Sequence, residues 1–164
     1  MSTPFNTLEE KFLGQLPLVY FSEQQFVEAQ QKMIAGATDP MLKSGLQKHL
    51  EETKQHVTNL ESVFFSMGKK PTAEKCPICL GLVASGETAM KAAGTDALRD
   101  ASILGSSVLV EHYEIAAYEG LVAQAEALGK TEIAAILKGN LAQEQQTAQR
   151  LENAAPMMMQ KAAA

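Results

Sequence analysis

The chain has 164 residues, of which 46% are hydrophobic and 5% aromatic, with no Trp and a formal net charge of −5 at pH 7. This length suits one domain with its own core, and a composition rich in Ala, Leu, Gln, Glu and Met favours helix over strand, so we expect an all-α protein. The acidic balance argues against nucleic-acid binding, and no run reaches the roughly 18 apolar residues that would cross a membrane.

The N-terminal segment, residues 1–11, has no apolar region followed by a small-residue cleavage site. It therefore does not read as a secretory signal, and we expect a cytoplasmic protein.

The first predicted helix covers residues 7–35. Thr7 and Glu10 fit a capping box at its start, and apolar residues then recur at helical spacing. Pro17 interrupts the pattern. Either a new helix begins with Pro17 in its first turn, or one helix continues with a kink.

The second predicted helix follows a short turn and ends near residue 67. Asp39 is its expected N-cap and Pro40 its first residue. Residues 72–98 form a connection too long for a turn, and a short helix is expected within it over about residues 79–92.

The third predicted helix covers residues 98–128 and is expected to end at Gly129. Thr131 is expected to cap a fourth helix that ends near residue 155. Two helical hairpins joined by one long crossover predict a ferritin-like four-helix bundle. The predicted domain is 1–155, followed by a flexible tail over 156–164.

Each of the four long predicted helices carries one glutamate inside an otherwise apolar stripe. These residues are Glu23, Glu52, Glu114 and Glu144. A carboxylate buried without a partner takes up a proton rather than staying charged, so four that converge on one core indicate a cation, most simply a pair of metal ions.

Imidazoles and one further carboxylate accompany these glutamates. His49 lies three residues before Glu52 and His56 four residues after it, on the same helical face, and Glu111 lies one turn before Glu114. Four carboxylates offset two divalent cations, while imidazoles complete the coordination without added charge. The fourth helix, however, brings its glutamate without a histidine.

Cys76-Pro-Ile-Cys79 is a single C-x-x-C. Without a second pair it cannot form a four-cysteine zinc site, and without a βαβ context it does not indicate a thioredoxin fold. Two readings remain open: a pair of reduced thiols near a helix start, or a reversible, redox-responsive disulfide.

Three strings carry a resemblance to a known family. They are His49-Leu-Glu-Glu-Thr-Lys-Gln-His-Val-Thr-Asn-Leu-Glu61, Glu111-His-Tyr-Glu-Ile-Ala-Ala-Tyr118 and Leu141-Ala-Gln-Glu144. In order and spacing, over about residues 7–154, the chain resembles the YciE/YciF family of bacterial ferritin-like stress-response proteins. The resemblance implies a ferritin-like bundle, usually dimeric, with a rubrerythrin-like dinuclear metal site and a role in stress.

The family's site positions transfer to specific residues of this chain. By position they fall on Glu23, His49, Glu52, Thr53, Glu111, Glu114 and Glu144. The chain departs from the family in the fourth helix, where Gln143 stands in place of a second acid and Ala148-Gln149 in place of a later Asp. Cys79 also looks like an addition.

The preferred hypothesis is a di-iron or dimanganese oxidoreductase that acts on peroxide or dioxygen. We interpret Glu52 and Glu144 as bridging ligands. The terminal ligands are then Glu23, Glu114 and His56, with Glu111 and His49 as further ligands or supports. Two alternatives are a non-catalytic helical stress protein that acts through a homodimer or a partner surface, and a thiol switch at Cys76 and Cys79.

Overall fold

The structure is a computed structural model that describes residues 4–164, and within this range it contains five helices and no strand. They are α1 (Leu8–Gly36), α2 (Pro40–Ser66), α3 (Pro77–Ala92), α4 (Asp96–Ala127) and α5 (Thr131–Ala163). The all-α prediction is confirmed. Residues 1–3, which the predicted domain includes, lie outside the described residues.

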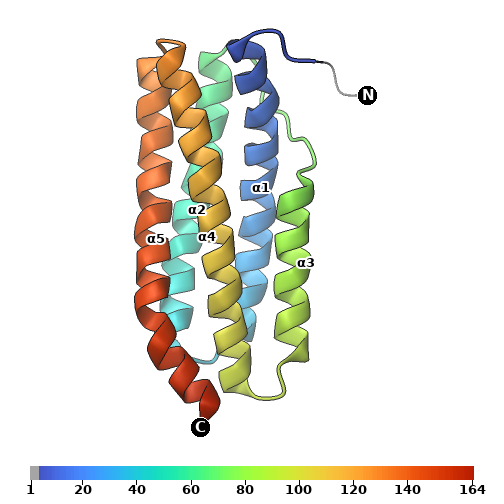
Figure 1. Cartoon of the computed structure of the whole chain (residues 1–164), viewed down its shortest axis with the longest axis vertical. Coiled ribbons are helices and arrows are strands. Elements are labelled where there is room, and N and C mark those ends of the chain that lie inside the picture. Colours follow the sequence, from blue (N-terminus) through green and yellow to red (C-terminus); the bar gives the residue numbers. More distant parts are fainter. Residues whose placement is uncertain (1–3) are drawn as a thin grey trace.

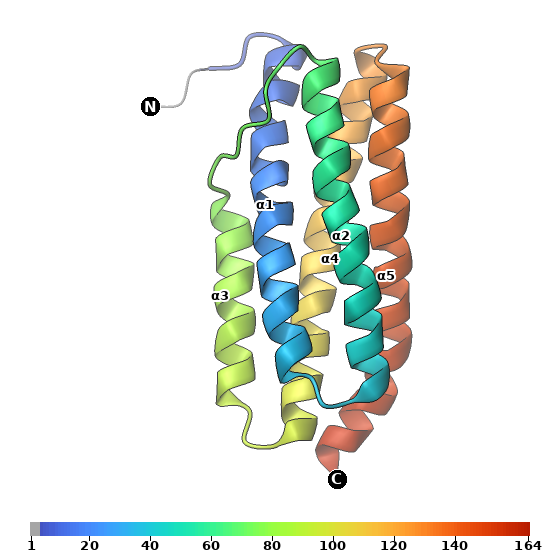
Figure 2. The same cartoon turned by 180° about the vertical axis from the view of Figure 1, so that it is seen from behind.

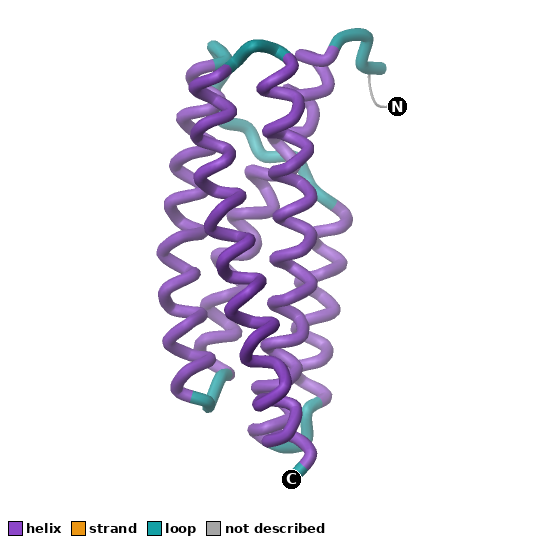
Figure 3. Tube along the Cα trace, turned by 60° about the vertical axis from the view of Figure 1, so that its left-hand side comes forward, coloured by secondary structure: helices purple, strands orange, loops and turns teal. Residues whose placement is uncertain are grey.

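The four long helices form a bundle of two hairpins, α1 with α2 and α4 with α5 (Figure 1). The crossover between the hairpins brings the chain back along the outside of the bundle, so α2 and α4 run in the same direction (Figure 2). α3 belongs to this crossover and packs on α1 and α4. Loops lie only at the bundle ends and along the crossover (Figure 3). This is the predicted connectivity.

Local signals in the sequence set most helix boundaries. Thr7 and Glu10 form the predicted capping box, and Asp39 accepts hydrogen bonds from the first backbone amides of α2. Gly129 follows the end of α4 with φ of 69°, a conformation that costs glycine nothing. Of the two alternatives at Pro17, the structure has a single continuous helix.

Two predicted features of α5 are wrong. Its N-cap is Lys130, without a side-chain cap, and Thr131 is already helical. The helix also continues through Pro156 to Ala163, where the sequence suggested a tail. Proline removes one helical hydrogen bond, but Met158 is buried in the lower apolar cluster, which includes Leu42 and Leu104. Packing of this last stretch offsets the lost bond.

The buried apolar residues form three clusters, of which the smallest, with Phe26, Cys79 and Val110, lies under α3, and the other two fill the bundle above and below its middle. The upper cluster includes Phe12, Leu60 and Leu121, and the lower one contains Leu42 and Met158. Buried polar side chains lie between them, at mid-height of the four long helices. No helix within residues 4–164 is long and apolar enough to cross a membrane.

Candidate metal centre

Six acidic and histidine side chains meet in the middle of the bundle, and we call them the polar layer. They are Glu23 from α1, His49 and His56 from α2, Glu111 and Glu114 from α4, and Glu144 from α5. Each is at most 3% exposed. Six of the seven predicted ligands therefore converge as expected, from all four long helices.

The polar layer contains two overlapping clusters of ligand atoms, each within 4.8 Å of one another. In the first, Nδ1 of His56 lies 2.8 Å from Oε1 of Glu144 and 3.4 Å from Oε1 of Glu23. Glu144 belongs to both clusters, and its two oxygens face different histidines. Glu144 is therefore the one carboxylate of the polar layer that both clusters share.

The second cluster joins Glu144 to His49, Glu111 and Glu114. Nε2 of His49 lies 3.2 Å from Oε1 of Glu111 and 3.6 Å from Oε2 of Glu144. Together the two clusters bring four carboxylates and two imidazoles into a volume that could hold two divalent ions.

The ligand atoms of the polar layer lack hydrogen-bond partners. Among the described residues, nine buried side-chain nitrogen and oxygen atoms have none, and eight of these nine belong to the polar layer. Four of the eight have ion-pair contacts only, namely Nε2 of His49, Nδ1 of His56 and both oxygens of Glu144. The other four, Oε2 of Glu23, Oε2 of Glu111 and both oxygens of Glu114, take part in no hydrogen bond or ion pair among the described residues. Buried polar atoms are rarely left unpaired, so a concentrated group of them is a strong sign that another species completes the site.

The electrostatics of the polar layer point the same way. Burial lowers the pKa of His56, but its contacts with Glu144 and Glu23 outweigh this and raise it to about 11, and the pKa of His49 rises in the same way, beside Glu111, to about 9. Burial and the neighbouring carboxylates raise the pKa of Glu144 to about 8. They also hold the pKa of Glu114 well above its usual range. Positive charge is thus needed here, and without a metal ion protons supply it.

Neighbouring side chains orient the ligand atoms. Nε2 of His56 lies 2.7 Å from Oε1 of Gln143. Because an amide oxygen only accepts hydrogen bonds, Nε2 carries the proton and Nδ1 is left to face the carboxylates. Gln143, which the sequence suggested was a missing acid, therefore fixes the histidine. Tyr118 donates a hydrogen bond to Glu23 and accepts one from Asn140 at 3.0 Å.

Glu52 does not join the polar layer. Its side chain is 16% exposed and lies at the edge of the bundle, 3.4 Å from Lys48, from Arg150 and from Nδ1 of His49. The adjacent Thr53 is the fully buried residue. Glu52 is thus placed to hold His49 from outside rather than to bridge two ions, which reverses the roles that the sequence suggested.

The ligand set departs from the usual pattern of dinuclear carboxylate bundles, in which two helices give one Glu each and the other two give Glu-x-x-His. α1 follows it with Glu23, and α4 gives one carboxylate more than the pattern asks for. α2 instead has Thr53-x-x-His56 and α5 has Glu144-x-x-Thr147, so each has half of the pair. His49 supplies the second imidazole, and the extra carboxylate on α4 replaces the one missing from α2. The three-residue spacing before His56 is the signal that would have identified position 53.

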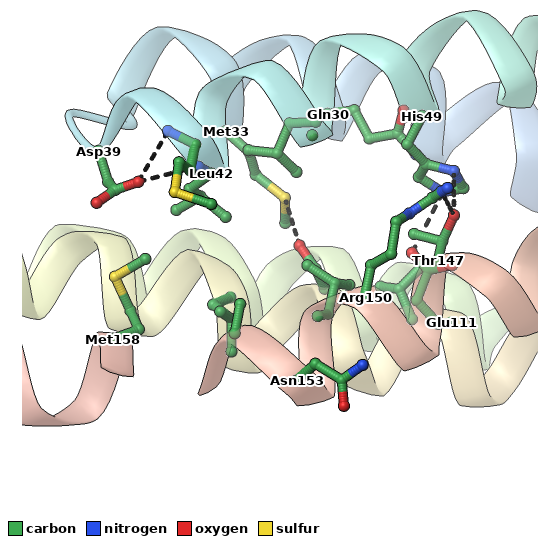
Figure 4. A pocket seen from close by; sticks show the side chains of 18 of the residues that line it. Gln30, Met33, Asp39, Leu42, His49, Glu111, Thr147, Arg150, Asn153 and Met158 are labelled. Atoms are coloured by element: carbon green, nitrogen blue, oxygen red, sulfur yellow. Dashed lines mark hydrogen bonds and ion pairs between the residues drawn. The ribbon is translucent and has the colours of Figure 1, made fainter. Parts of the chain in front are cut away.

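An apolar cavity of about 390 Å³ adjoins the polar layer in the lower half of the bundle. His49, Glu111 and Thr147 line one end, and Leu42 and Met158 line the other (Figure 4). Arg150 reaches from α5 toward His49 and Thr147 at the polar end. The candidate centre therefore has an apolar approach of its own.

Cys76 and Cys79 are both free and buried at the start of α3. Sγ of Cys76 lies 3.1 Å from the hydroxyl of Tyr113, and Cys79 contacts the backbone carbonyl of Ser22. Tyr113 and Ser22 are the chain neighbours of Glu114 and Glu23. The two cysteines thus lie behind the polar layer but contribute no ligand atom to its two clusters.

Comparisons with known proteins agree with this architecture. The chain is 31% identical to Protein YciF of Escherichia coli over 142 residues, which is 86% of each chain. The crystal structure of the E. coli stress protein YciF matches with a TM-score of 0.90 over 96% of this chain and 99% of that one, at 30% identity. YcfI of Rhodopseudomonas palustris, described as a candidate structural protein, matches at 37% identity with a TM-score of 0.90, covering 93% and 97%.

A more distant match defines the fold class. Ferritin-like, diiron-carboxylate proteins of Bacillus anthracis match at 17% identity with a TM-score of 0.72, over 92% of this chain and 99% of that one. The fold is thus ferritin-like, as predicted. The family described as "Domain of unknown function (DUF892)" matches residues 7–164. With the resemblance to YciF-type proteins confirmed, the chain belongs to this family.

Proposed function

We propose that the polar layer holds a dinuclear iron or manganese centre, and that the protein uses it to reduce peroxide or dioxygen during stress. The observation that carries the proposal is the set of eight buried ligand atoms that have no hydrogen bond inside the bundle. The set has the composition that two divalent cations require, with four carboxylates to balance charge and two imidazoles to complete coordination. The description of the E. coli relative as a stress protein supports the physiological setting.

The proposed ligands follow from the two clusters. Glu23 and His56 would hold one ion, His49, Glu111 and Glu114 would hold the other, and the carboxylate of Glu144 would be shared. Two ferrous or manganous ions held there would supply the two electrons of one reduction, one from each ion, and a reductant outside the protein would return those electrons before the next. Breaking the O–O bond of a peroxide takes two electrons and two protons, and yields an alcohol or water together with one water molecule.

The protein's own part is to position groups, exclude water and hold protons. Burial and the charge of Glu23 raise the pKa of Tyr118 well above its usual range, so its phenol stays protonated and keeps donating to that carboxylate. The upper apolar cluster closes one side of the layer. The lower side opens into the apolar cavity, which gives a substrate an approach to the polar layer.

Metal content and peroxide consumption test the two halves of the proposal. Protein loaded with Fe²⁺ or Mn²⁺ is expected to bind two ions per chain, and anomalous scattering at the two metal edges should place them on either side of Glu144. With ascorbate added as the reductant, the loaded protein should consume peroxide over many cycles and the metal-free protein should not. Well under one ion per chain would refute the metal centre. Two bound ions without turnover would refute the oxidoreductase and favour a structural role.

A thiol switch is the second candidate, because the two cysteines differ in the way that a reactive pair requires. Burial raises the pKa of Cys76, but hydrogen bonds from the Cys79 amide and from Tyr113 lower it by more, so the pKa lies below its usual value. Burial raises the pKa of Cys79 to about 11. A thiol with a lowered pKa at a helix N-terminus can attack peroxide as the thiolate. The neighbouring thiol then attacks the oxidised sulfur, and a disulfide forms.

Peroxide treatment of the metal-free protein tests this switch. One equivalent of hydrogen peroxide and the two thiols would give a disulfide and two water molecules, so intact mass should fall by two hydrogens and both cysteines should resist alkylation after unfolding. The Cys79→Ser variant should instead stop at an oxidised Cys76, and Cys76→Ser should show neither change. If wild-type thiols stay reduced under excess peroxide, the switch is wrong.

A further inference from the structure

The cavity below the polar layer has the form of a ligand site rather than of a packing defect. Its volume of about 390 Å³ lies within the roughly 300–1,000 Å³ typical of small-molecule pockets. We propose that it binds an unbranched aliphatic molecule with an uncharged hydroxyl or hydroperoxyl head group. The tail would lie between the two hairpins, with the head against the polar layer.

The length of the cavity fits an extended aliphatic chain. Its lining on α2 extends from Asp39 at the helix start to His49, a distance of ten residue steps that spans about 15 Å at helical rise. Methionine and leucine side chains form much of the wall, including Met33, Leu46 and Met158. Such flexible apolar groups adapt readily to an aliphatic ligand.

The polar end offers a hydroxyl group a hydrogen-bond acceptor. Oε2 of Glu111 is buried and takes part in neither a hydrogen bond nor an ion pair, and Glu111 lines the cavity. A hydroxyl or hydroperoxyl group can donate to this oxygen, whereas Nε2 of His49 is already engaged by Oε1 of Glu111 at 3.2 Å. An unpartnered acceptor at one end of an apolar slot therefore marks where a head group belongs.

The charges around this end favour a neutral head group. Glu111 lines this end of the cavity, so a carboxylate head group would lie against a second buried carboxyl group and could not donate a hydrogen bond to it. Arg150 also lines the cavity, but its guanidinium already donates to Thr147 at 2.6 Å and to Glu52 at 3.4 Å. An anionic amphiphile is thus expected to bind less well than the alcohol of equal length.

This inference names a substrate class for the proposed centre, but the binding itself does not rest on a metal ion. An aliphatic hydroperoxide seated in the cavity would bring its O–O bond to the polar layer. The lining includes exposed residues of α2 and α5, such as Gly45 and Asn153, so the cavity opens to solvent between these helices. A ligand can enter there without unfolding the bundle.

Calorimetric titration of the metal-free protein with 1-decanol, decanoate and short-chain butanol tests the proposal. Decanol should bind saturably with a negative heat-capacity change, as burial of apolar surface requires. Decanoate and butanol should each bind at least about tenfold more weakly, a difference of about 1.4 kcal/mol. Because no metal is present, a negative result here leaves the metal centre standing, and failure of the metal centre leaves this result standing.

A cavity-filling variant supplies the matched control. Gly45 and Ala154 line the cavity, and a Cβ built at Gly45 meets nothing within 4 Å, so Gly45→Leu with Ala154→Leu should fill it without strain. Gly139→Leu with Ala135→Leu adds the same side chains at exposed positions of α5 outside the lining. Decanol binding should fall at least about tenfold in the first variant and persist in the second. No saturable decanol binding, equal loss in both variants, or tighter binding of decanoate would overturn the proposal.

Discussion

Replacing Glu144 by glutamine is expected to abolish binding of both metal ions rather than of one. Its two oxygens face His56 and His49 in different clusters, and it is the one residue that the two clusters share. An amide of the same shape keeps the packing but removes the bridging charge. Equilibrium dialysis against Mn²⁺, followed by metal analysis of the folded variant, measures the loss.

Glu52→Gln is the matched control for this experiment. Glu52 lies outside the clusters and contacts Nδ1 of His49 from the edge of the bundle. Loss of a group that only orients a ligand typically weakens metal affinity by roughly 10–100-fold while leaving the stoichiometry intact. Glu52→Gln should therefore still load two ions at high Mn²⁺, and Glu144→Gln should not. If the two variants lose metal alike, Glu52 bridges as the sequence suggested, and the geometry derived for Glu144 is wrong.

The distinction between these two glutamates explains how far sequence could predict the site. Helical periodicity placed Glu23, Glu114 and Glu144 inward correctly, because each lies in the centre of an apolar stripe. On α2 the stripe passes through positions 52 and 53 alike, since His49 and His56 are seven residues apart. Between these two positions the sequence suggested the one that can bind a metal ion, Glu52, whereas the structure buries Thr53. Adjacent helical positions differ by about 100°, which only packing against the other helices resolves.

The fold was more predictable than the site because it depends on signals that act locally. The capping box at Thr7, the Asp39 cap and Gly129 each set a helix boundary within its own turn. The continuation of α5 beyond Pro156 depends instead on burial of Met158 against another hairpin. The cavity is harder still to foresee, because it arises where the side chains of four helices fail to meet, and no single residue marks it.

Replacing Glu114 by leucine is expected to stabilise the metal-free protein and to reduce its stabilisation by metal. Glu114 is 2% exposed and neither of its oxygens has a hydrogen-bond partner. Relief of one unsatisfied buried group is worth about 1–3 kcal/mol. Thermal unfolding with and without Mn²⁺ measures both effects. The wild type should gain more from Mn²⁺ than the variant, because a ligand that binds only the folded state stabilises it.

The exposed Glu119 of the same helix supplies the control. Glu119→Leu should change neither the stability of the metal-free protein by more than about 0.5 kcal/mol nor the response to Mn²⁺. Destabilisation by Glu114→Leu in the metal-free protein would mean that the carboxyl group has a structural partner, and would remove the argument from unpartnered atoms.

The advantage of the leucine variant should also grow as pH rises. The folded-state pKa of Glu114 lies well above 4.5, so between its unfolded and folded pKa values the folded protein binds more protons than the unfolded one. The free energy of unfolding then falls with increasing pH. Glu144, with a pKa of about 8, and His49, with a pKa of about 9, act in the same direction in the metal-free protein. Metal ions displace these protons, so saturating Mn²⁺ should make the free energy of unfolding of the wild type nearly independent of pH. In the metal-free protein, Glu114→Leu should remove only the part of the pH dependence that Glu114 causes.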